Sequence, residues 1–236
     1  MKRTVRFALS CAVLFACSGF CVAQTNASSS ASSVPARPEV SFQFDRPGLA
    51  VPRFTLTVHE DGSGTYKAEE APVSGGAGMQ SMPGKQIDRS ITLSQPTVAT
   101  IFKTARSLDH FNIECASKAK NIADTGKKTL SYSGADGHGS CTYNYSDNKN
   151  VMSLTETFQA IAFTMDEGRR LEFLHRYDRL GLDAEMENLT HEFEQKRAME
   201  LETISSTLAS LAGDDAVMQR VRTQAAKLLG QIGDQK

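Results

Sequence analysis

The sequence predicts an α+β protein in which a small, mostly antiparallel sheet carries a packed helix and is followed by a C-terminal helical hairpin. Residues 40–44 and 54–58 alternate apolar and polar side chains, as half-buried strands do. A turn at residues 60–64, with Asp-Gly at its centre, leads into a returning strand at 65–68. From Val151 onward the spacing of apolar residues becomes helical.

Further elements are expected between these two patterns. Residues 87–93 predict a short strand, and Ser94 and Pro96 suit the N-cap and the first turn of a following helix. Residues 128–133 and 141–145 predict a second hairpin, which turns across the glycine-rich residues between them. The glycine-rich stretch 71–85 is expected to be a mobile surface loop.

The C-terminal part is expected to consist of helices. Residues 151–165 predict one amphipathic helix and residues 169–177 a second. A long helix is expected over 184–212, and a final one carries the apolar stripe of 217–232. We expect the last two to form an antiparallel hairpin, which either packs on the sheet or presents a docking surface.

The N-terminal residues 1–23 have the pattern of a secretory signal peptide. A basic head precedes an apolar run of about ten residues, whereas a membrane span needs roughly 20. Small residues before the Ala23–Gln24 bond suit cleavage at that point. In a competing interpretation, residues 14–17 form a lipobox in which Cys17 is acylated, although Phe15 is bulky for its position. The protein would then be anchored to the cell envelope.

Four parts are therefore expected: a signal peptide at 1–23, a flexible Ser/Ala-rich leader at 24–38, an α+β domain at 39–166 and a helical region at 167–236. The chain has 26 basic and 27 acidic residues, and losing the three basic residues of the signal leaves a net charge of about −4. Because no basic stripe is present, nucleic acid is not expected as a partner. The mature protein is expected in the periplasm or secreted.

Only two cysteines, Cys115 and Cys141, lie beyond the signal. In an oxidising compartment they are expected to pair. The closed loop of about 27 residues would contribute roughly 3–4 kcal/mol in the chain-entropy model. The alternatives are two buried free thiols, or a metal site completed by Glu114 and His138.

The string Asp124-Thr125-Gly126 follows Ile122-Ala123, as the catalytic aspartate of an aspartic protease follows an apolar strand. Such enzymes need two aspartates that share a proton. The chain contains no second copy of the motif, although a homodimer would supply one. The plainer interpretation of Asp124 is a turn residue that precedes a strand.

Two other groups are candidates for metal or acid–base chemistry. Glu172, His175 and Asp178 are spaced to share one helical face, where they would hold a divalent metal or act as an acid–base pair, or simply form a polar helix surface. Met79 and Met82 lie in the glycine-rich stretch, where thioethers suit Cu(I). The two methionines lack a third soft ligand or a nearby histidine, and a flexible loop is the plainer interpretation.

Four motifs follow one another between Phe54 and Phe158. They are a strand, Asp-Gly turn and strand at 54–66, a helix ending in Phe at 98–111, an Asp-x-Gly with a hairpin at 124–145, and a closing helix at 154–158. In this order they resemble a family of bacterial exported α+β domains of unknown function. The resemblance implies a compact α+β fold and no known activity, and it leaves the tail from Glu167 uncovered.

We therefore expect an exported, non-enzymatic binding or structural module that uses no cofactor. Its partner is expected to be a protein, or a second copy that docks through the C-terminal helices. A membrane contact is expected only if Cys17 is acylated. The alternatives are an extracytoplasmic hydrolase that uses Asp124, a metal-dependent enzyme with its site around His175, and an envelope lipoprotein.

Overall fold

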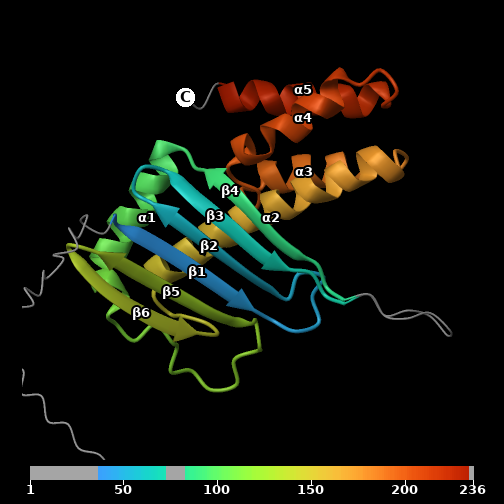
Figure 1. Ribbon diagram of the computed structural model, residues 1–236. Helices are drawn as coiled ribbons and strands as arrows, with labels where there is room; N and C mark the ends of the chain where they lie inside the picture. The colour runs from blue at the N-terminus through green and yellow to red at the C-terminus, as the bar shows by residue number, and fades with distance from the viewer. Residues whose placement is uncertain (1–36, 73–82, 234–236) are drawn as a thin grey trace, which may run out of the picture. The chain divides into compact units, whose positions relative to one another are not determined.

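The computed structural model describes residues 37–72 and 83–233 (Figure 1). The expected signal, its cleavage point at Ala23–Gln24, Cys17 and almost all of the leader lie outside these residues. So do residues 73–82 of the expected loop, with Met79 and Met82. Residues from Pro35 onward belong to one compact unit.

Six strands form one antiparallel sheet in the order β4-β3-β2-β1-β5-β6. The strands are β1 (Glu39–Asp45), β2 (Arg53–His59), β3 (Ser63–Glu69), β4 (Gln86–Thr92), β5 (Lys127–Gly134) and β6 (Gly137–Tyr143). In β1 and β2 every second side chain is buried, because one face of the sheet is covered and the other is not. The alternation in the sequence therefore predicted these strands correctly.

The second hairpin turns more tightly than the sequence suggested. Only Ala135 and Asp136 lie between β5 and β6, so that β6 begins at Gly137 rather than near residue 141. A Cβ atom at Gly137 would come within 2.7 Å of the His110 ring, which explains why glycine stands there. The Asp136 carboxylate accepts a hydrogen bond of 2.7 Å from the Tyr132 hydroxyl and closes the turn.

Two helices cover one face of the sheet (Figure 1). They are α1 (Gln95–Ser107), which continues into the short 3-10 helix η1 (Asp109–Phe111), and α2 (Lys149–Tyr177). Their apolar side chains and the covered face of the sheet form a first hydrophobic core. At its centre the rings of Phe42 and Phe158 are stacked, with centroids 5.2 Å apart.

The chain ends in α3 (Leu182–Glu194), the 3-10 helix η2 (Leu201–Ile204), α4 (Ser205–Gly213) and α5 (Gln219–Gly233). These elements and Leu171 of α2 enclose a second hydrophobic core. The most extensive contact among them is that between α4 and α5, which form the C-terminal hairpin. The predicted α+β class, with its C-terminal helices, is confirmed.

The prediction of two separate helices over 151–165 and 169–177 is wrong, because α2 is continuous for 29 residues. Gly168 lies inside it without breaking it. A Cβ atom there would lie 2.2 Å from the Cγ2 atom of Ile204, so glycine allows η2 to approach the helix. One helix thus supplies Phe158 to the first core and Leu171 to the second.

The prediction of one long helix over 184–212 is also wrong. The chain leaves α3 at Glu194, and Lys196 and Glu200 adopt left-handed backbone angles, each with φ of 59°. The break is stabilised from outside the segment. The Ser94 amide and hydroxyl donate to the two oxygens of the Glu200 carboxylate, both at 2.7 Å, and the Thr97 hydroxyl donates to the same group. Glu200 therefore caps the N-terminus of α1, where the Ser94 side chain was expected to act.

The disulfide is present as expected. Cys115, after η1, is bonded to Cys141 in β6, with Cα atoms 5.8 Å apart. Both residues are buried. The bond joins the segment after α1 to the edge strand of the sheet. Because both cysteines are used in this bond, the alternatives of two free thiols or a metal site are wrong.

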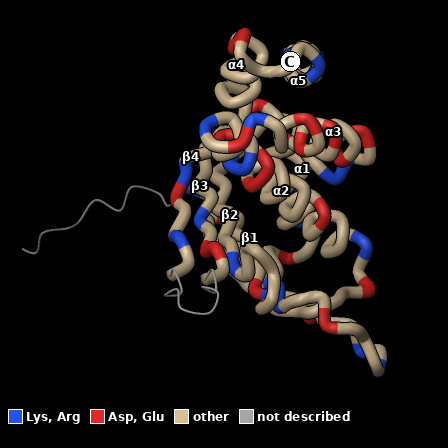
Figure 2. Tube along the Cα trace, turned by 90° about the vertical axis from the view of Figure 1, so that its right-hand side faces the viewer, with Lys and Arg blue, Asp and Glu red and all other residues tan. Residues whose placement is uncertain are grey.

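Acidic and basic positions are interspersed over the strands and helices (Figure 2). The described ranges 37–72 and 83–233 contain no helix that is long and apolar enough to cross a bilayer.

Candidate functional site

A groove with a volume of about 1730 Å³ runs along α2. Its opposite wall is formed by the ends of β1 and β2 with the loop between them, by the residues around Glu70 and Lys85, and by the start of β5. Near the C-terminal end of α2 it is closed by side chains of α4. Groove residues on α2 extend from Met152 to Tyr177, which corresponds to roughly 38 Å at 1.5 Å per residue.

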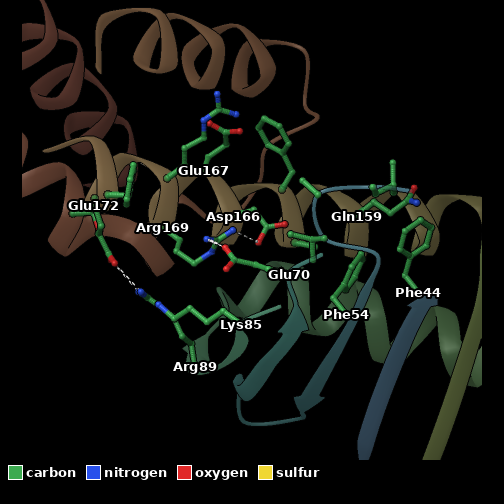
Figure 3. A pocket seen from close by; sticks show the side chains of 18 of the residues that line it. Phe44, Phe54, Glu70, Lys85, Arg89, Gln159, Asp166, Glu167, Arg169 and Glu172 are labelled. Atoms are coloured by element: carbon green, nitrogen blue, oxygen red, sulfur yellow. Dashed lines mark hydrogen bonds and ion pairs between the residues drawn. The ribbon is translucent and has the colours of Figure 1, made fainter. Parts of the chain in front are cut away.

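One end of the groove contains two phenylalanine rings (Figure 3). There the rings of Phe44 and Phe54 lie opposite Gln159 of α2. Large apolar side chains are also exposed along the groove. Among the described residues, six such side chains are exposed, and four of them line it: Leu49, Tyr145, Phe173 and Tyr177. Exposed apolar side chains that gather in one concave surface are typical of a binding site.

Charged side chains also line the groove, and those labelled in Figure 3 lie beyond Phe54 when seen from Phe44. The lining contains eight cationic side chains, Arg46, Lys85, Arg89, Lys128, Arg169, Arg170, Arg176 and Arg179, and five carboxylates, Glu70, Asp166, Glu167, Glu172 and Asp214. The groove is thus cationic, although the chain has a formal net charge of −1.

Several of these cations bridge the two walls. Arg89 of β4 donates two hydrogen bonds, of 2.9 and 2.7 Å, to the Glu172 carboxylate. Arg169 pairs with Glu70 across the groove and lies 3.8 Å from Asp166. The Tyr66 hydroxyl donates to Asp166 at 2.8 Å. Despite these partners, burial raises the pKa of the Asp166 carboxyl.

Glu167 points away from the sheet (Figure 3), on the side of α2 that faces α3. It and Glu185 of α3 are both 6% exposed. Burial and the neighbouring Glu185 carboxyl raise the pKa of Glu167 to about 8. Arg170 forms an ion pair with Glu185 at 2.8 Å, and one oxygen of Glu167 has no hydrogen-bond partner. At neutral pH Glu167 is therefore mostly protonated, and it adds little negative charge to the groove.

Lys128 is cationic, but its ammonium group is bound within the fold and is not available to a ligand. Its ammonium group is buried and donates to the carbonyl oxygens of Thr125, Gly126 and Asn144 at 3.1, 3.1 and 2.8 Å. These contacts occupy its three N–H groups. Burial, together with the charge of Arg46, lowers the pKa of Lys128. Lys128 thus holds the turn before β5 against the end of β6.

Three cations of the groove have no carboxylate partner among the residues that the structure describes. They are Arg46 in the loop after β1, Lys85 before β4 and Arg176 in the last turn of α2. The guanidinium of Arg176 lies over the ring of Tyr177 at 5.9 Å. All three are exposed, and we call them the unpaired cations.

The structure separates the predicted Glu172, His175 and Asp178 set. Glu172 and His175 line the groove, whereas Asp178 caps the C-terminus of α2 outside it. The His175 ring pairs with Asp214, with Nε2 and Oδ2 2.8 Å apart, and this contact lowers the pKa of the Asp214 carboxyl. In the described ranges, no three His, Cys, Asp or Glu side chains are arranged to hold a metal ion. His175 thus joins α2 to the end of α4.

Asp124 lies in a turn. Its carboxylate accepts a hydrogen bond of 2.9 Å from the backbone N–H of Gly126, which has φ of +94°. This is the geometry of an Asx turn, which glycine at the left-handed position completes. The side chain does not line the groove, so the structure offers it no place beside a ligand there.

Apart from Glu172 and His175, the groove residues could not be predicted from the sequence, because they come from distant segments. Arg46 and Lys85 are 39 positions apart in the sequence, and Arg176 is 91 positions further on. One sequence pattern could have indicated a binding surface. It is the run Arg169–Leu180, in which arginines are interspersed with Phe173 and Tyr177.

Neither the comparison with protein families nor that with curated proteins places the chain in a family. No family model matches it, and no curated protein matches it. The resemblance to exported α+β domains therefore stays a prediction.

Proposed function

We propose that the protein is an exported binding module, and that its groove along α2 holds an extended segment of another polypeptide. The composition of the lining supports this most directly. Arginine, phenylalanine and tyrosine together supply twelve of its 32 residues, with six arginines and six of these aromatic residues. These are the residues that are enriched where proteins bind one another.

The size of the groove agrees with an extended ligand. Its volume of about 1730 Å³ exceeds the roughly 300–1,000 Å³ of small-molecule sites. At about 3.4 Å per residue, an extended segment of roughly 11 residues matches the length of the lining on α2. Exposed backbone in such a segment would find donors and acceptors in Gln159 and the charged side chains.

Within residues 37–72 and 83–233, no comparable observation supports catalysis. The carboxyls of Glu167 and Glu185 are buried between two helices, so a substrate in the groove does not reach the unpartnered oxygen of Glu167. The described hydrogen bonds pair His175 with Asp214, and they pair the Ser210 hydroxyl of the same groove with the backbone carbonyl of Ser206. A catalytic pair would need a nucleophile hydrogen-bonded to the histidine.

Site-specific photo-crosslinking tests the proposal. A benzophenone side chain replaces Gln159 inside the groove or, as a matched control, Thr142 on the open face of the sheet. The full chain is expressed in its native host and irradiated there. We expect a covalent adduct from position 159 alone, in which mass spectrometry identifies peptides of one other polypeptide. Equal labelling from both positions, or an adduct with a second copy, would contradict the proposal.

A further inference from the structure

The charges of the groove identify the chemistry of its ligand. Four of its arginines already have carboxylate partners within the fold: Arg89, Arg169, Arg170 and Arg179. Lys128 is bound to carbonyl oxygens. The unpaired cations are therefore an excess that the fold itself does not use.

One of the five carboxylates in the lining, that of Glu167, reduces this excess of positive charge less than the count suggests. Burial and the neighbouring Glu185 carboxyl raise the pKa of Glu167 to about 8. Glu167 is therefore mostly protonated at neutral pH. An anionic ligand consequently meets little repulsion from this group.

We propose that the segment bound in the groove is acidic. Its carboxylates pair with Arg46, Lys85 and Arg176, and its apolar side chains contact the exposed rings of Tyr145 and Phe173. This inference rests on the proposed function, and it specifies the class of partner: a polypeptide that carries an extended stretch in which acidic and apolar residues are mixed.

The placement of the unpaired cations favours an extended ligand over a single anion. Arg46 is in the β1–β2 loop, Lys85 lies beyond β3, and Arg176 is near the C-terminal end of α2. They therefore occupy both walls of the groove. A ligand that reaches all three needs several negative charges spread along its length, and apolar groups between them for Phe44 and Phe173.

The ligand class is tested by selecting from a phage library of random 12-residue peptides on the immobilised full chain. We expect the recovered peptides to be enriched in Asp and Glu, with Leu, Phe or Tyr between them. The affinity of the most frequent peptide is then measured by fluorescence anisotropy. Raising the salt from 50 to 500 mM should weaken it at least fivefold, because exposed charge pairs are screened.

Single substitutions locate the contacts. Arg46→Gln, Lys85→Gln and Arg176→Gln should each weaken binding of the selected peptide about twofold to fivefold, since an exposed charge pair contributes up to about fivefold in affinity. The matched control is Lys103→Gln, an exposed lysine on α1 outside the groove. It should leave the affinity unchanged.

The outcomes separate the two proposals. Recovery of peptides without acidic enrichment, or equal affinity for a Glu-to-Gln version of the selected peptide, would overturn the acidic ligand while leaving the groove as a peptide site. Failure to select any peptide would count against both proposals. Binding of phosphatidylglycerol vesicles through the same three cations, with no peptide selected, would show that the partner is an anionic membrane surface.

Discussion

At the scale of single residues, Glu200 makes the described hydrogen bonds that join the most distant positions in the sequence. Its carboxylate accepts hydrogen bonds from Ser94, 106 positions earlier in the chain. The first N–H groups of a helix have no partner inside the helix, and they cost free energy if they are buried unpaired. Glu200 supplies the partner and adds negative charge at the positive end of the α1 dipole.

We expect Glu200→Ala to lower the free energy of unfolding by roughly 1–3 kcal/mol, the range for lost caps and lost charged hydrogen bonds. Urea unfolding followed by circular dichroism measures the change. The control Glu194→Ala removes an exposed carboxylate of α3 and should change stability by no more than about 0.5 kcal/mol. A loss in Glu200→Ala no larger than in this control would disprove the capping role.

The Glu167–Glu185 pair gives the stability a defined pH dependence. In the unfolded chain Glu167 releases its proton near pH 4.5, whereas in the fold the pKa is about 8. The folded state therefore binds more protons between these values, and stability falls as the pH rises through this window. Glu167→Gln should remove the decline and raise the melting temperature at pH 8.

Thermal unfolding of the wild type and of Glu167→Gln at pH 5, 6, 7 and 8 measures this effect. Glu187→Gln, at an exposed carboxylate of α3, serves as the control and should keep the wild-type pH profile. Parallel profiles for Glu167→Gln and the wild type would mean that the pair is not the source of the dependence.

At the scale of elements, α2 depends on a glycine that helix propensity disfavours. Gly168 costs about 1 kcal/mol relative to alanine in an ordinary helix. Here it lets Ile204 of η2 pack against the helix backbone. We expect Gly168→Ala to destabilise the protein by about 1–3 kcal/mol through overpacking, and to be less harmful in an Ile204→Ala background. A double-mutant cycle by urea unfolding measures the coupling, and additive effects would contradict it.

Strands β1, β2 and β3 were predictable from sequence because their side chains alternate over a sheet with one covered face. Even so, the turn between β5 and β6 was predicted to be longer than it is, because the glycines around Ala135 and Asp136 resemble loop residues. Gly137 is instead a strand residue that makes room for His110. A glycine chosen for close packing and a glycine chosen for a turn look alike in a sequence.

The helical tail was harder to predict for a physical reason. The apolar spacing of 184–212 continues through the break, and no proline or glycine marks it. The chain turns because the Met199 amide donates to the Thr164 hydroxyl of α2, at 3.0 Å, and Glu200 reaches α1. Such tertiary contacts override local propensity and leave no local signal. The groove was hidden for the same reason, since its cations meet only in the folded chain.

At the scale of the whole molecule, α2 links the two hydrophobic cores. We expect unfolding to be a single transition, because neither core is complete without this helix. Near-ultraviolet dichroism reports Tyr66, Tyr132 and Tyr143 in the first core, and far-ultraviolet dichroism reports all helices. The two signals should give the same urea midpoint.

Core substitutions extend this test. Phe158→Ala in the first core and Leu189→Ala in the second should each lower the stability by roughly 2–5 kcal/mol, and each should shift both signals together. A Leu189→Ala protein whose tyrosine signal keeps the wild-type midpoint would show that the cores unfold independently.

The Glu200 contact also determines how early α1 can be capped while the chain is being synthesised. Synthesis proceeds at about 5–20 residues per second, so the carboxylate that caps α1 follows Ser94 after roughly 5–20 s. Once residue 143 has been made, all residues of the sheet and of α1 exist, but the helix end is still uncapped and the second core is missing. We therefore expect the nascent protein to stay incompletely folded until its tail has been made, a delay that suits the export that we propose.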